Sequence, residues 1–277
     1  MVDLHTHSDA SDGESTPSEL IGLAHKAGVT ALALTDHDTL AGIPEAMNAA
    51  NDVGIRLIPG VETEVEFQPG EFHLLGLGMN RFEEGPLEDF LGEIRRRRVT
   101  RNEEMVDLMQ NDSRDVSLEV LDAIAGGDVT GRMHFAHWLI SEGLAGNVPD
   151  AFERWLGPGR PYHVTKNRPK LQETLDAIHE SGGLAVIAHP LSLWISWGRL
   201  SQYLPEWKEM GLDGVEARHS GASAREAVRF EELAVQHGMF ITGGSDYHGS
   251  GRPDRTLGHG SAGKPLEETL LAPWDHD

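Results

Sequence analysis

The stretch VDLHTHSDASDG at residues 2–13 joins a short apolar run to a cluster of histidines and aspartates. Residues 2–5 form the kind of short, β-rich run that predicts a strand. The run ends in His5, Thr6 and His7, and residues two apart in a strand share a face. Two imidazoles on one face can bind one cation. The stretch therefore predicts a strand whose end carries part of a metal site.

Six more short apolar or β-branched runs predict further strands. They cover residues 30–35, 56–61, 72–77, 184–188, 213–217 and 239–242. Helical patterns follow most of these runs, and the patterns end at glycines. The first helix has a predicted capping box at Thr16 and Glu19 and is expected to end near Gly28. Strands that alternate with helices predict a parallel α/β sheet, either open or closed into a barrel.

Two segments depart from this alternation. The turn sequence QPGE at residues 68–71 separates two strand-like runs, which predicts a hairpin and one antiparallel strand. Residues 82–168 are helical in pattern throughout. We therefore predict a barrel made of residues 1–81 and 169–277, with an inserted helical subdomain at 82–168. An insertion after a barrel strand is expected over the carboxyl ends of the strands, where such folds place their sites.

Composition excludes several functional classes. The chain has 277 residues, with Lys plus Arg at 23, Asp plus Glu at 45 and a net charge of −22. This charge argues against a protein that coats DNA or an anionic membrane. The absence of cysteine excludes disulfides, thiolate metal sites and thiol nucleophiles. No signal-peptide pattern and no run of 18 apolar residues occurs, so we expect a cytoplasmic protein without a membrane span.

His, Asp or Glu follows the apolar run at several other predicted strand ends. The motifs are TDHD at 35–38, GVE at 60–62, AHP at 188–190 and GSDYH at 244–248, with one further histidine in the hairpin. The candidate metal ligands are His5, His7, Asp12, His37, Glu62, His73, His189, Asp246 and His248. Nine ligands exceed what one ion needs, so we expect two or three divalent ions. Imidazole and carboxylate suit Mn, Fe and Zn, and none of the three is excluded.

As a set, these motifs resemble the PHP (polymerase and histidinol phosphatase) superfamily. The resemblance implies a distorted (β/α)7 barrel with a trinuclear metal centre and a metal-dependent phosphoesterase activity. It implies that His5, His7, Glu62 and Asp246 hold one ion, that Glu62, His73 and His189 hold a second, and that Asp12, His37 and His248 hold a third. Asp12 stands where several relatives have a histidine. The resemblance also implies a catalytic role for Asp246, and Asp36 and Asp38 are expected to orient histidines.

The inserted segment resembles the branch of the superfamily that acts on nucleoside 3′,5′-bisphosphates and on short RNA 5′ ends. We therefore expect hydrolysis of the 3′-phosphate of such bisphosphates, of short oligoribonucleotides, or of both, by a hydroxide that bridges metal ions. Arg132 begins a predicted helix, and Lys166 and Arg218 offer further positive charge for substrate phosphates. His219 matches the family's histidine and is expected to contact phosphate or to act as a general acid. Tyr162 could stack on a base.

Three other functions stay open on the sequence alone. One is a phosphatase of the histidinol phosphate type. Another is a metal-dependent amidohydrolase, because a His-x-His strand also begins that family, although no lysine follows a predicted strand here. The third is a metal-stabilised scaffold or nucleotide sensor without catalytic turnover. Phosphate-ester and amide substrate panels would separate these functions. The sequence names no oligomeric partner.

Overall fold

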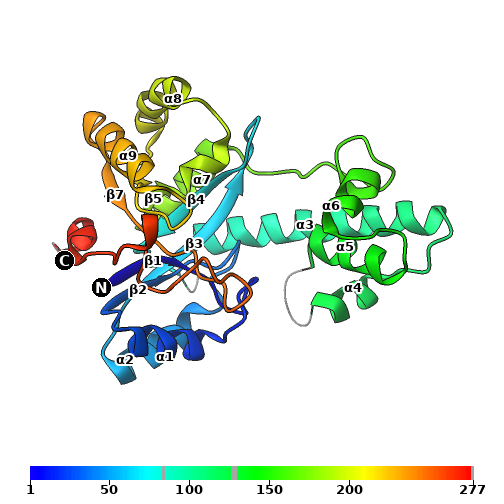
Figure 1. Cartoon of the computed structure of the whole chain (residues 1–277), viewed down its shortest axis with the longest axis horizontal. Coiled ribbons are helices and arrows are strands. Elements are labelled where there is room, and N and C mark those ends of the chain that lie inside the picture. Colours follow the sequence, from blue (N-terminus) through cyan, green and yellow to red (C-terminus); the bar gives the residue numbers. More distant parts are fainter. Residues whose placement is uncertain (83–84, 126–129, 276–277) are drawn as a thin grey trace. The chain divides into compact units, whose positions relative to one another are not determined.

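Among the residues that the structure describes, seven strands form one sheet, in the order in which they follow one another along the chain (Figure 1). The computed structural model describes residues 1–82, 85–125 and 130–275. The strands are β1 Val2–Thr6, β2 Ala31–Leu34, β3 Arg56–Val65, β4 Phe72–Leu77, β5 Leu184–Ile187, β6 Gly214–Glu216 and β7 Phe240–Thr242. Neighbouring strands are parallel, except that β4 runs antiparallel to both β3 and β5. The predicted hairpin is therefore confirmed.

The segment that follows β7 closes the sheet onto its first strand. The Leu4 N–H donates to the carbonyl of Gly243 at 3.2 Å, and Thr6 pairs in parallel with Tyr247. All five residues of β1 are buried, as expected for a strand with neighbours on both sides. The curled sheet with its outer helices confirms the predicted distorted (β/α)7 barrel.

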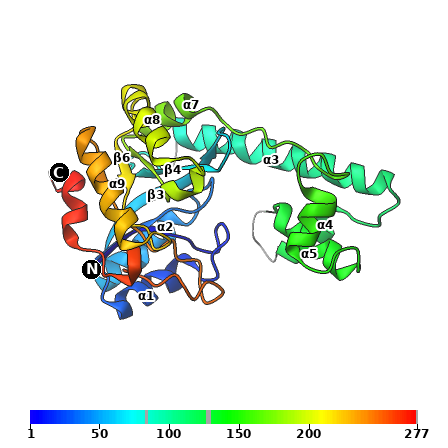
Figure 2. The same cartoon turned by 45° about the horizontal axis from the view of Figure 1, so that its top comes forward.

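Helices cover the outside of the barrel. They are α1 Pro17–Ala27, α2 Ile43–Val53, α7 Leu171–Glu180, α8 Trp197–Met210 and α9 Ala224–Gln236. The Thr16–Glu19 capping box and the left-handed Gly28 at the end of α1 are both present, as predicted. In two views α1 and α2 lie side by side, while α7 packs against β5 and α9 against β6 and β7 (Figures 1 and 2). Among the described helices, none has the length and apolar character needed to cross a membrane.

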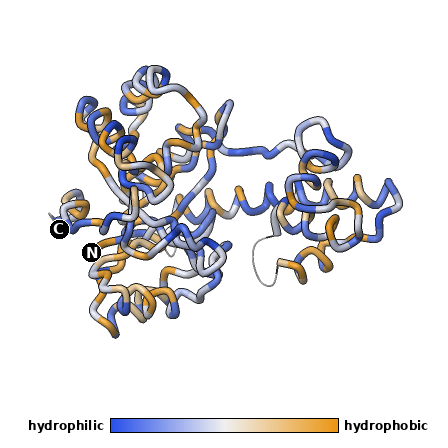
Figure 3. The backbone as a smooth tube through the Cα atoms, viewed as in Figure 1, coloured by the Kyte–Doolittle hydropathy of each residue, from blue (hydrophilic) through white to orange (hydrophobic). Residues whose placement is uncertain are grey.

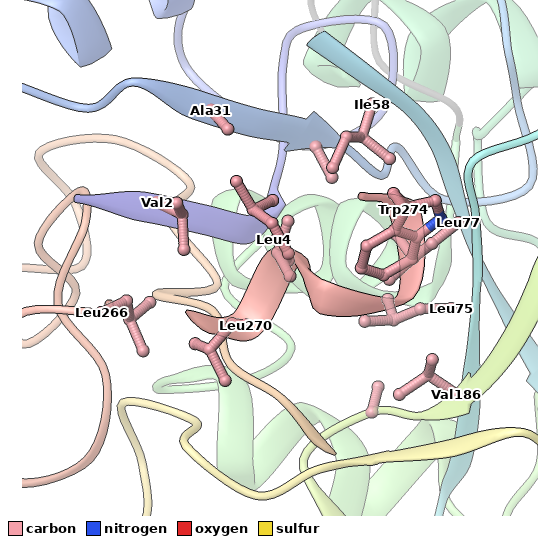
Figure 4. Close-up of a cluster of buried hydrophobic side chains, with 13 residues drawn as sticks. Val2, Leu4, Ala31, Ile58, Leu75, Leu77, Val186, Leu266, Leu270 and Trp274 are labelled. Atoms are coloured by element: carbon pink, nitrogen blue, oxygen red, sulfur yellow. The ribbon is translucent and has the colours of Figure 1, made fainter. Parts of the chain in front are cut away.

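The amino-terminal end of the barrel is closed by the last part of the chain (Figure 4). The 3-10 segment Glu268–Trp274 contributes Leu270 and Trp274 to a buried cluster with Val2, Leu4 and Leu77. The Val2 N–H donates to the carbonyl of Leu266 at 3.0 Å, which joins this segment to β1. Because apolar side chains fill this end, polar chemistry is left to the opposite end, where the parallel strands finish.

A second compact unit spans Gly92–Asn167, and the barrel unit consists of Met1–Leu91 and Arg168–Asp277. The helices between β4 and β5 are α3 Pro86–Asn111, α4 Leu118–Ala125, α5 Arg132–Ser141, α6 Val148–Ala151 and a π-helical turn at Phe152–Leu156. Apolar and polar residues intersperse along the helices of both units (Figure 3). In α3, Arg96 and Arg97 pair with Glu93 at i, i+3 and i, i+4 spacing, which is typical of a solvated helix face.

Tyr162 belongs to the core of the second unit. Its side chain is only 1% exposed, and its ring stacks on Trp155 with 5.2 Å between centroids. The Tyr162 hydroxyl donates to Asp112 at 2.6 Å and accepts from Arg114 at 3.1 Å. The expectation that Tyr162 stacks on a substrate base is therefore wrong, because both the ring and the hydroxyl already serve the packing of this unit.

Candidate metal centre

The nine candidate ligands gather at the end of the barrel where the parallel strands finish. β4 runs the other way, so His73, near its beginning, reaches the same end. Ligand atoms within 4.8 Å of one another form four groups: His7, Asp12, His37 and His248; His5, Glu62 and His189; His5, His7 and Asp246; and His37, Glu62 and His73. The structure thus brings all nine residues together, although they come from separate strands and loops.

The most buried group lies around His5 and His7. Their Nε2 atoms are 3.1 Å apart. Glu62 Oε2 lies 3.2 Å from the first nitrogen and 3.3 Å from the second, and Asp246 Oδ1 lies 3.6 and 3.4 Å away. Two ring nitrogens that face each other with two carboxylate oxygens form a donor set suited to a divalent cation.

Glu62 links this group to a second one. Its side chain is 1% exposed. Its other oxygen, Oε1, lies 2.8 Å from His73 Nδ1 and 2.9 Å from His189 Nε2. Oε2 also lies 3.3 Å from His37 Nδ1. One carboxylate therefore stands between two sets of imidazoles, which is the arrangement expected of a bridging ligand.

A third group surrounds Asp12, whose Oδ1 lies 3.3 Å from His248 Nε2 and whose Oδ2 lies 3.8 Å from His37 Nε2. His7 Nδ1 lies 3.8 Å from the same carboxylate. That nitrogen is buried and has no hydrogen-bond partner among the described residues. A buried, unpartnered ring nitrogen beside a carboxylate and two other imidazoles fits a cation between them. His7 thus takes part in two groups, whereas the resemblance alone placed it in one.

The electrostatics of the site favour positive charge at its centre. Burial opposes charge on His7, yet hydrogen bonds to Asp246 and Glu62 raise its pKa to about 10. Burial would raise the pKa of Glu62, but the surrounding histidines, led by His37 and His5, hold that pKa well below its usual range. Burial lowers the pKa of His37 itself to about 3, so the imidazoles cannot all be protonated together. Divalent cations would supply the same charge without protons.

Glu216, at the end of β6, is a functional residue that the sequence analysis missed. It is fully buried, and its Oε1 accepts a hydrogen bond from His5 Nδ1 at 3.0 Å. Its Oε2 accepts from the backbone N–H of His189 at 2.6 Å. A proton held on His5 Nδ1 leaves the Nε2 lone pair directed at Glu62 and His7, as a metal ligand requires. An acidic residue inside the apolar stretch Val215–Ala217 was the available signal.

Replacing Glu216 by Gln is expected to lower metal affinity by about 10- to 100-fold. Either the His5 ring N–H or the His189 backbone N–H would then face an amide N–H₂ instead of a carboxylate oxygen. Metal titration against a competing chelator measures this change. Glu232→Gln, at an exposed position of α9, is the matched control and should bind metal like the wild type. Unchanged affinity in Glu216→Gln would contradict the positioning role.

His219 lies beside the ligand groups. Its side chain is buried, and its Nε2 is 3.3 Å from Asp246 Oδ2. The Gly221 N–H donates to the other ring nitrogen, Nδ1, at 3.0 Å. A neutral imidazole that accepts at Nδ1 carries its proton on Nε2, so His219 presents a donor toward Asp246. This geometry fits a residue that contacts a phosphate oxygen.

The other predicted substrate contacts differ in their surroundings. Arg218 donates to Glu231 at 2.7 Å and to Glu267 at 3.3 Å, so the structure gives its predicted role in substrate binding no support. Arg132 and Lys166 belong to the second unit, where the Arg132 guanidinium lies 5.5 Å from the Phe152 ring centroid. Their contact with substrate stays a prediction.

Asp36 holds a loop rather than a histidine. It accepts hydrogen bonds from the Ser8 backbone N–H, from the Ser8 hydroxyl and from the Ser11 hydroxyl, each at 2.7 Å. These bonds fix the loop that follows β1 and carries Asp12. Asp36 thus supports the ligands through this loop rather than by a hydrogen bond to an imidazole.

Comparisons with known proteins agree with this geometry. The PHP domain family matches residues 3–182. A 3′,5′-nucleoside bisphosphate phosphatase of Chromobacterium violaceum is 32% identical over 99% of this chain and 99% of its own. A 5′-3′ exoribonuclease of Haemophilus influenzae is 34% identical over 89% of each chain.

A solved structure of a Chromobacterium violaceum protein, described as an amidohydrolase with bound sulfate and no metal, has a TM-score of 0.81 and 29% identity, and covers 99% of this chain and 95% of its own. The fold, the ligand groups and these relatives confirm the resemblance drawn from the strand-end motifs. The chain belongs to the PHP domain family and is a metal-dependent phosphoesterase.

Proposed function

We propose that this protein removes the 3′-phosphate of nucleoside 3′,5′-bisphosphates and also acts on short oligoribonucleotides. The observation that carries the proposal is the position of Glu62, whose two oxygens each lie within 3.3 Å of imidazoles from different ligand groups. Such sharing supports a centre of two or three ions, of a kind that suits phosphoryl displacement. A relative that is aligned over 99% of both chains and is named for bisphosphate hydrolysis supports the substrate class.

The nine candidate ligands would hold the ions as three sets, with Mn, Fe and Zn as the candidate metals. When bound, the ions activate water and neutralise charge on the phosphoryl group. The protein's own side chains position the ligand rings and the phosphoryl group. Glu216 holds the His5 ring in position. Asp246 directs Oδ1 toward His5 and His7 and Oδ2 toward His219. His219 donates a hydrogen bond to a phosphoryl oxygen.

The second phosphate of the substrate needs its own positive charge, because the chain carries −22 overall. We assign this role to Arg132 and Lys166 in the second unit. Arg132 is the first residue of α5, where backbone N–H groups favour an anion.

The test is phosphate release from adenosine 3′,5′-bisphosphate by Mn²⁺-loaded protein, with chelator-treated protein as control. We expect release only from the loaded protein, and slower release from histidinol phosphate. Turnover of histidinol phosphate alone, or of an amide panel alone, would replace the proposal by one of those activities. Tight nucleotide binding without turnover would instead indicate a sensor. A 5′-phosphorylated oligoribonucleotide in the same assay ranks the two substrate classes.

A further inference from the structure

Arg255 lies in the loop that follows β7, and its side chain is only 12% exposed. The loop is fastened to the segment after β1 by Glu14. That carboxylate accepts hydrogen bonds from the Ser250 N–H, the Ser250 hydroxyl and the Gly251 N–H, each at 2.8 Å. Glu14 thus ties the start of the loop that carries Arg255 to the barrel.

Asp246 connects Arg255 to the ligand groups. Asp246 Oδ1 faces His5 and His7, at 3.6 and 3.4 Å. Asp246 Oδ2 faces the other way and lies 3.3 Å from both Arg255 Nη1 and His219 Nε2. Arg255 and His219 thus stand one carboxylate away from the candidate metal centre.

The contact between Arg255 and His219 lacks an acceptor. Arg255 Nη1 lies 2.8 Å from His219 Nε2, while the Gly221 N–H donates to His219 Nδ1 at 3.0 Å. A neutral imidazole has one lone pair and one N–H, so it cannot accept from both sides. Arginine stays protonated, and Asp246 Oδ2 is farther from both donors than the 2.7–2.9 Å, roughly, of a charge-assisted bond.

Arg255 Nε is buried and has no hydrogen-bond partner among the described residues, although the exposed Asp254 carboxylate lies 3.3 Å from it. Arg255 Nη1 has one further contact, a donation to the Ser220 hydroxyl at 2.5 Å. The guanidinium and the His219 N–H thus place two donors beside the ligand groups, close enough together to donate to one anionic oxygen.

We propose that Arg255 binds the phosphoryl group that is cleaved, with His219 as the second donor. This inference rests on the proposed function and adds to it a residue that holds the scissile phosphate, distinct from Arg132 and Lys166, which would hold the remote one. A phosphoryl oxygen that receives both N–H groups would satisfy the pair and place positive charge where negative charge develops.

The test compares Arg255→Gln with Arg252→Gln, an exposed arginine of the same loop. With Mn²⁺-loaded protein, Arg255→Gln should lower kcat/KM by about 100-fold, both on adenosine 3′,5′-bisphosphate and on adenosine 3′-phosphate, which lacks the remote phosphate. Arg132→Gln should lose activity on the bisphosphate alone. Arg252→Gln should match the wild type, and metal content should be unchanged in all variants.

Calorimetric titration with inorganic phosphate separates this inference from the proposed function. Arg255→Gln should weaken phosphate binding to the Mn²⁺-loaded protein by about tenfold or more, whichever ester proves to be the substrate. Arg255→Lys should recover part of the loss, because it restores charge without the guanidinium fork. If the wild type hydrolyses neither nucleotide, the proposed function fails and the titration still decides the role of Arg255.

Three kinds of result would overturn the inference. The first is unchanged phosphate affinity in Arg255→Gln, or a wild type that binds no phosphate. The second is a loss of activity confined to the bisphosphate, which would place Arg255 at the remote phosphate. The third is a fall in metal content that accompanies the loss in both Arg255→Gln and Arg255→Lys, which would make the residue a support of the ligand loop.

Discussion

Glu62→Gln is expected to lower phosphate release by at least about 10³-fold and to reduce the amount of bound metal. The amide has nearly the shape of the carboxylate but no charge. Its N–H₂ group would face imidazoles that face a carboxylate oxygen in the wild type. Glu62 Oε2 and Oε1 each contact histidines from different strands, at 2.8 to 3.3 Å, so one substitution weakens more than one group of ligands. Stabilisation by bound ions amounts to several kcal/mol, which corresponds to a rate factor of this size.

The measurement pairs metal content by mass spectrometry with turnover of adenosine 3′,5′-bisphosphate. Glu66→Gln is the matched control, because the Glu66 side chain is exposed and its backbone N–H, which the substitution leaves in place, donates to the carbonyl of Pro169. Thermal unfolding should show that both variants are folded. Full metal content in Glu62→Gln, with turnover within about tenfold of the wild type, would remove Glu62 from the centre of the site.

The strands could be predicted from sequence because each is a short apolar run that ends at a polar or glycine-rich boundary. The end of α1 is also determined by the local sequence, since Gly28 takes the left-handed conformation that stops the helix. The closure of the barrel, in contrast, depends on contacts between residues that are distant in sequence. Tyr247 pairs with Thr6, and Leu266 accepts from Val2, although neither partner lies in a run that resembles a strand. Only the curvature of the whole sheet brings these segments together.

The functional site likewise contains residues that local sequence predicts and residues that depend on contacts between distant parts of the chain. The predicted ligands come directly after or beside apolar runs, where the ends of parallel strands meet. Glu216 lies inside such a run, and its role depends on His5 and His189, which are distant in sequence. Arg255 lies beside Asp246 and His219 although it is in a loop that follows β7 and that Glu14, distant in sequence, fastens to the barrel. Arg218 stays a predicted substrate contact, but its partner Glu231 comes from α9, and that packing cannot be seen in the sequence around Arg218.

Gly244→Ala is expected to destabilise the barrel by more than about 2 kcal/mol, at the upper end of overpacking or beyond. Gly244 follows β7 and lies against β1. A Cβ there would come within 2.2 Å of His5 Cβ, 2.8 Å of Glu216 Oε1 and 2.9 Å of the His5 backbone nitrogen. The clashing atoms include the backbone of β1, which is fully buried. Movement of a flexible side chain therefore cannot relieve the clash. Relief requires β1 to shift, which would also break the His5–Glu216 hydrogen bond.

Urea unfolding of the metal-free proteins measures this effect without a contribution from metal affinity. Gly22→Ala is the control, because a Cβ at Gly22 in α1 meets nothing within 4 Å. That substitution should stabilise the protein by about 0.5–1 kcal/mol, since alanine is the better helix former. The same chemical change is thus expected to act with opposite sign at two glycines. A Gly244→Ala protein as stable as the wild type would mean that β1 and the segment after β7 can separate without cost, and that the barrel is not closed at this seam.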